Sequence, residues 1–117
     1  MNFNNSSIPI ASLWDVIVEN QGKKFVTKKG LPFTYIIKGG ELFTDRRERS
    51  ITRSTFEKAY EKLQMDQAGE NAPRKIVGPK TLNMYGAPYV WAVFVGIGLI
   101  EEPQREQSLY EQQEMQF

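Results

Sequence analysis

The chain has 117 residues, a length that fits one domain able to bury a core without disulfides or metals. It contains neither Cys nor His, which excludes disulfides, thiolate chemistry, the usual zinc ligands and Ser–His–Asp triads. The net charge is only +1, but residues 22–62 hold eleven Lys and Arg against five Asp and Glu. Because electrostatic attraction is local and screened beyond about 8–10 Å, this basic middle can attract polyanions.

The first predicted element is an amphipathic helix that begins at Ser12. Ser12 and Asp15 have the spacing of a capping pair at a helix N-terminus. Leu13 and Ile17 follow at helical spacing, and residues 20–22 end the helix. The pattern favours a plain core helix.

A set of short strands is predicted next, because aromatic and β-branched residues alternate between turn residues. The predicted strands are 24–28, 31–38, 41–44 and 49–51. Their connections are too short for crossovers, so the strands form an antiparallel meander.

A second helix is predicted to begin after Thr52, the expected N-cap. Ile51 and Phe56 have the spacing of a hydrophobic staple around this cap. Ala59, Tyr60 and Leu63 continue the apolar stripe that Phe56 begins.

The remainder of the chain is less regular. Within the irregular stretch 65–86, residues 66–73 are polar and rich in helix-breaking residues and indicate a surface loop. Ile76 and Val77 are candidates for a further short strand. Residues 89–95 fit a buried strand or a buried helix. A helix is favoured because Pro88 suits a first helical turn and Gly96 suits a helix end.

These elements predict an α+β fold: a small antiparallel sheet of three to four strands with about three helices on one face. The expected organisation is a flexible N-terminus over residues 1–8, one domain over 9–100, and a polar tail rich in Gln and Glu over 101–117. The N-terminus lacks the pattern of a secretory signal, and the longest apolar run, 87–100, is shorter than the roughly 20 residues of a membrane span. We therefore expect a cytoplasmic protein without a membrane partner.

The search for catalytic patterns assigns no catalytic residue, no metal ligand and no cofactor. Residues 78–81 pair Lys with Thr beside a glycine, but the spacing of a nucleotide-binding phosphate loop is missing. Glu41, Asp45 and Glu48 are the candidates for a metal-dependent enzyme, the weakest alternative, because neighbouring arginines would neutralise the last two. We expect a protein that is not an enzyme.

The basic residues carry the main functional hypothesis, a nucleic-acid-binding module. Its expected phosphate contacts are Lys28, Lys29, Arg46, Arg47, Arg49 and Arg53. Interleaved aromatics such as Phe33 and Tyr35 would stack on unpaired bases if they were exposed. The same residues also fit a solvated charged surface over an aromatic core. DNA and RNA both remain open as partners.

The alternative hypothesis is a protein-interaction or homodimerisation module. It uses the apolar segment 89–100 and the C-terminal tail, where Leu109, Tyr110, Met115 and Phe117 are the apolar residues.

Two stretches also support a resemblance. The first runs from Phe33-Thr34-Tyr35 to the Arg49-Ser50-Ile51-Thr52-Arg53 step into the second helix, followed by Phe56 and Ala59. The second is residues 86–92. Together they resemble short uncharacterised bacterial domains found alone or beside restriction and other DNA-related enzymes, over about residues 25–100. Pro88 stands where these domains have Ser. The resemblance implies a helix after Pro88 and a DNA-related role, with no catalytic residues to transfer.

Overall fold

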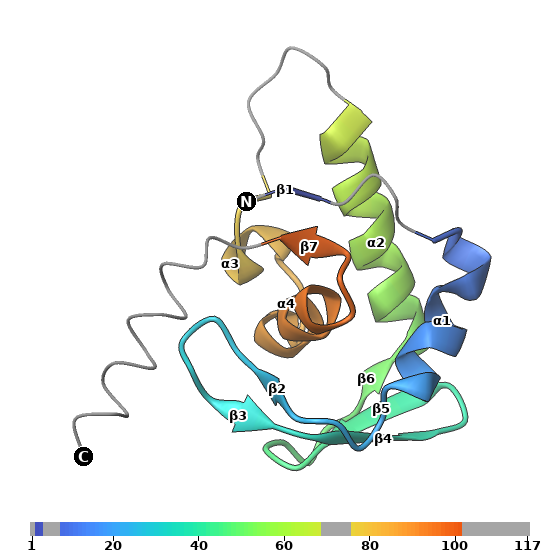
Figure 1. Cartoon of the computed structure of the whole chain (residues 1–117), viewed down its shortest axis with the longest axis vertical. Helices are drawn as coiled ribbons and strands as arrows, with labels where there is room; N and C mark the ends of the chain where they lie inside the picture. Colours follow the sequence, from blue (N-terminus) through green and yellow to red (C-terminus); the bar gives the residue numbers. More distant parts are fainter. Residues whose placement is uncertain (1, 4–7, 69–75, 102–117) are drawn as a thin grey trace.

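The structure is a computed structural model that describes residues 2–3, 8–68 and 76–101. Within these ranges it contains four helices and three small antiparallel sheets. The helices lie on one side of the two sheets that the middle of the chain forms (Figure 1). The predicted α+β class is therefore confirmed.

The strands pair in short antiparallel ladders. β2 (Phe25–Val26) pairs with β3 (Pro32–Phe33). β4 (Tyr35–Lys38), β5 (Glu41–Thr44) and β6 (Ile51–Thr52) form a second sheet in the order β4-β5-β6. The connections within both sheets are short, as expected for a meander.

The predicted strand 31–38 is wrong in one respect, because the structure divides it into β3 and β4. Thr34 separates them and exchanges two hydrogen bonds with Asp45: its amide donates to Oδ1 at 3.0 Å, and the Asp45 amide donates to its carbonyl at 3.1 Å. The two halves pair with different partners, β2 on one side and β5 on the other. The predicted alternation holds along both, with Phe33 and Tyr35 buried and Ile36 exposed.

The first helix, α1 (Ile10–Glu19), begins two residues before the predicted start. Ser12 is therefore not its N-cap; Pro9 takes that place in an extended conformation. Proline suits this position because it has a fixed φ and no amide hydrogen that the first turn would leave unpaired. Ile10 also packs against the core, which extends the apolar stripe toward the N-terminus.

The second long helix, α2 (Arg53–Ala68), begins where it was predicted. The Thr55 amide donates to Oγ1 of Thr52 at 3.4 Å, and Ile51 and Phe56 are both buried beside this cap. Capping and staple therefore act together at this helix N-terminus.

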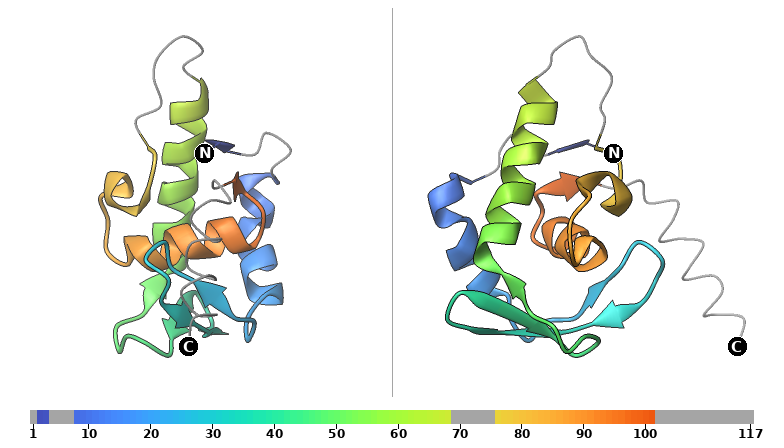
Figure 2. Two further views of the ribbon diagram at one scale, coloured as in Figure 1. Left: turned by 60° about the vertical axis from the view of Figure 1, so that its left-hand side comes forward. Right: turned by 180° about the vertical axis from the view of Figure 1, so that it is seen from behind.

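The ambiguous apolar segment is a helix, α4 (Ala87–Gly96), preceded by the short α3 (Pro79–Leu82). α4 lies in the middle of the molecule, between α2 and the β2–β3 hairpin (Figures 1 and 2). Val90, Trp91, Val93 and Phe94 are all almost completely buried. A helix that is apolar all round must be covered on every side, so this segment is the centre of the core. Its side chains are already covered within one chain, which leaves little of them for a protein partner.

The two ends of the described chain meet. β1 (Asn2–Phe3), from the segment expected to be flexible, pairs with β7 (Ile100–Glu101). The tail residues 102–117, including the apolar residues proposed for an interaction, lie outside the described residues. Within the described chain, no helix combines the length and apolar character that crossing a bilayer requires.

Candidate functional site

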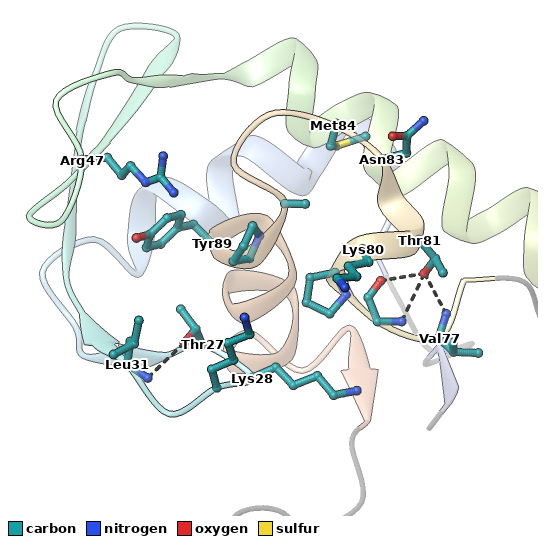
Figure 3. Close-up of a pocket in the computed structure, with 15 residues that line it drawn as sticks. Thr27, Lys28, Leu31, Arg47, Val77, Lys80, Thr81, Asn83, Met84 and Tyr89 are labelled. Atoms are coloured by element: carbon teal, nitrogen blue, oxygen red, sulfur yellow. Dashed lines mark hydrogen bonds between the residues drawn. The ribbon is translucent and has the colours of Figure 1, made fainter.

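A pocket of about 750 Å³ opens between the β2–β3 hairpin loop and the segment 77–89, which carries α3 and the start of α4 (Figure 3). A pocket of this size falls in the range that proteins use to bind small molecules or parts of larger ones.

Four cations line this pocket: Lys28 and Lys29 from the hairpin loop, Arg47 from the β5–β6 turn, and Lys80 from α3. Among the described residues that line it, none is Asp or Glu. The side chain of Lys28 reaches across to the opposite wall. Its Nζ lies 3.5 Å from the position that a Cβ would take on Gly78. Positive charge that converges on a concave surface raises the local potential and favours an anion.

The hairpin loop holds its two lysines through Thr27 and Gly30. The Gly30 amide donates to the Thr27 carbonyl at 2.8 Å, and the Leu31 amide donates to Oγ1 of Thr27 at 3.0 Å. Gly30 has a φ of +91°, which glycine adopts at low cost. A three-residue loop with a left-handed glycine at its third position is a standard hairpin connection. It places Lys28 and Lys29 at the tip.

The opposite wall is held by the hydroxyl of Thr81. Its Oγ1 accepts hydrogen bonds from the amides of Val77 at 3.0 Å and Gly78 at 3.2 Å, and it donates to the Gly78 carbonyl at 2.7 Å (Figure 3). Pro79 occupies the first turn of α3, and Asn83 ends it in a left-handed conformation. This short, well-bonded turn fixes the backbone that carries Lys80.

Apolar side chains cover the surface between the cations. Tyr89 is buried, with its ring edge-on to Phe33 at a centroid distance of 5.0 Å. The guanidinium of Arg47 lies 5.8 Å from the Tyr89 centroid, a cation–π contact. Leu31 and Val77 line the same pocket and are 48% and 50% exposed. The site therefore combines apolar walls with a positive rim.

The other three predicted phosphate contacts do not line the pocket. Arg46 donates from Nε to the Pro32 carbonyl at 2.9 Å. Arg49 lies over the ring of Tyr85, and Arg53 forms an ion pair with Glu57 at 3.0 Å. The six predicted residues thus divide into three that line the pocket and three that make contacts elsewhere.

Sequence reasoning did not select Lys80, Val77 or Tyr89 as site residues. In the sequence, Lys80 stands out only through its pairing with Thr81 beside a glycine, and the glycine spacing of a phosphate loop is missing. Val77 lies in the irregular stretch 65–86, and Tyr89 begins the apolar segment that is expected to be buried. The Gly78-Pro79 pair indicates a helix start next to Lys80. It does not indicate that the β2–β3 hairpin loop faces Lys80 across a pocket.

Two of the three candidate carboxylates for a metal site accept local hydrogen bonds. Glu41 accepts from the Ser50 hydroxyl at 2.5 Å, and Asp45 accepts from the Thr34 amide. Across the described ranges, no three Asp or Glu residues gather in a group that could hold a metal ion.

Comparison of the chain with protein-family models, with curated proteins and with solved structures gave no match.

Proposed function

We propose that this chain is a non-enzymatic nucleic-acid-binding module whose basic pocket contacts backbone phosphates. One observation carries the proposal: four cations from three separate segments line one pocket, and no carboxylate is among its described lining residues. Surface charges are ordinarily of mixed sign, so such segregation favours a polyanionic ligand.

The donors suit phosphates. The guanidinium of Arg47 offers a planar fork of N–H groups, while Lys28, Lys29 and Lys80 act as point charges on flexible stems. Each phosphate that they neutralise releases condensed counterions, so binding should depend steeply on salt. With about four phosphate contacts, affinity should fall roughly 100-fold between about 50 and 200 mM salt.

The test is fluorescence anisotropy with labelled DNA and RNA oligonucleotides at these two salt concentrations. The site variant is the double substitution Lys29→Gln and Lys80→Gln. The control is Lys24→Gln with Lys58→Gln, two exposed lysines that do not line the pocket and whose loss changes the net charge equally.

The site variant should weaken binding and reduce the slope of log affinity against log salt by about two, and the control should leave both near wild type. The absence of binding at low salt would reject the proposal. An equal loss in both double variants would reject the pocket as the site.

A further inference from the structure

We infer that the pocket takes an unpaired base of a single-stranded nucleic acid, with the flanking phosphates held by the cations around it. This inference rests on the proposed function and names the ligand class of the same site.

The apolar walls are the first reason. Of the large hydrophobic side chains that are exposed, Leu31 and Val77 lie at this pocket. They belong to its two opposing walls, the hairpin loop and the segment before α3 (Figure 3). Phosphates alone would gain nothing from such side chains, whereas the apolar face of a base would cover them.

The distribution of charge is the second reason. Arg47 lies beside Tyr89 at one end of the pocket, and Lys80 lies away from it on the wall that Thr81 braces (Figure 3). Lys28 extends between the hairpin loop and Gly78. In a nucleic-acid strand, a phosphate lies on each side of every base. Cations on several sides of the pocket could therefore contact the phosphates that flank a bound base. A lipid carries its charge at one end and would need cations on one side only.

A base in a duplex would reach this pocket only at an energetic cost. In a duplex the bases are stacked, and reaching an apolar hollow requires a base to be unstacked and unpaired first. In a single strand the base faces are already accessible, and packing of a base against the aliphatic side chains of Leu31 and Val77 buries apolar surface whatever the base. Single strands are therefore favoured over duplexes.

The experiment compares four ligands for the full chain at low salt. They are a labelled strand of about six nucleotides, the same sequence as a duplex, an abasic oligomer with the same number of phosphates, and vesicles containing phosphatidylserine. Because the base would cover the exposed aliphatic side chains of Leu31 and Val77, the base-containing strand should bind at least about 5-fold more tightly than the abasic oligomer, and more tightly than the duplex.

A matched pair of variants locates this preference. Leu31→Ser with Val77→Ser removes exposed apolar surface at the pocket, and Val26→Ser with Ile36→Ser removes comparable surface, 45% and 50% exposed, elsewhere. The pocket variant should lose most of the preference for bases while still binding the abasic oligomer, and the control should keep it. The substituted side chains of both variants are exposed, so each variant should fold. Circular dichroism verifies this.

Each other outcome has a defined meaning. Failure to bind any polyanion defeats the proposed function itself. Binding of the duplex or the abasic oligomer as tightly as the strand overturns this inference and leaves a phosphate-binding face. Vesicle binding that the pocket variant abolishes, without base dependence, overturns it in favour of an anionic lipid.

Discussion

Tyr85 makes two contacts with Arg49, and together they join the β5–β6 turn to the loop between α3 and α4. The guanidinium of Arg49 lies 4.1 Å from the centroid of the Tyr85 ring, and the Tyr85 hydroxyl donates to the Arg49 carbonyl at 3.1 Å. Arg47 lies two residues earlier in the same turn and lines the pocket. The pair therefore fastens the wall that carries Arg47 to the segment that carries Lys80.

The substitution Tyr85→Ala should lower the free energy of unfolding by about 1–2 kcal/mol, because it removes both the cation–π contact and the hydrogen bond. Tyr85→Phe keeps the ring and should cost about half as much. Urea denaturation measures both variants. Equal losses would show that the ring contact with Arg49 contributes nothing.

Gly96→Ala should destabilise the protein, although the same change in an open helical position is normally stabilising. A Cβ at Gly96, the last residue of α4, would lie 2.4 Å from two ring carbons of Phe25 on β2. Such overpacking costs about 1–3 kcal/mol. Thermal unfolding measures the change in stability.

Gly40→Ala is the control for this prediction, because nothing lies within 4 Å of a Cβ added there. It should leave stability within about 0.5 kcal/mol of wild type. A stabilised Gly96→Ala variant would mean that α4 and β2 are less closely packed than the structure indicates.

Stability at alkaline pH should depend on Tyr35. Its hydroxyl is buried and donates to the Ile17 carbonyl at 2.6 Å, and burial raises the pKa of Tyr35 above its ordinary value. The folded state then favours the protonated form. The contribution of the protonated Tyr35 hydroxyl to the free energy of unfolding is complete below the unfolded-state pKa of about 10. It declines as the pH rises above that value toward the raised folded-state pKa.

Tyr35→Phe removes this titration together with the hydrogen bond. At neutral pH the variant should be less stable than wild type by about 1–2 kcal/mol. Above pH ~10 the wild type should lose stability faster than Tyr35→Phe, so the difference between their free energies of unfolding narrows. Urea denaturation at several pH values measures it, and parallel curves for the two proteins would contradict the prediction.

The N-terminus of α2 should depend on the hydroxyl of Thr52. Thr52→Ala should cost about 1 kcal/mol, because the Thr55 amide loses its acceptor. Thr52→Ser keeps an acceptor in the same place and should stay close to wild type. Chemical denaturation measures both, and a serine variant as unstable as the alanine variant would exclude capping as the cause.

The elements that sequence predicted well are those whose signals act within a few residues. Thr52 and the flanking apolar pair mark the start of α2, and Pro88 and Gly96 mark α4. The strand 41–44 coincides with β5. Caps, prolines and turn residues restrict the backbone locally, so their consequences can be read without knowing what packs nearby.

Sequence alone therefore determined the α+β composition, the N-cap of α2 and a surplus of cations in the middle of the chain. Tertiary packing decided that 31–38 divides into two strands, since each half follows a different pairing partner. It also decided which cations meet, because Lys28, Arg47 and Lys80 come together only when the hairpin and α3 pack around α4. Contacts between segments far apart in the sequence depend on how the whole core packs. Local residue patterns do not predict that packing.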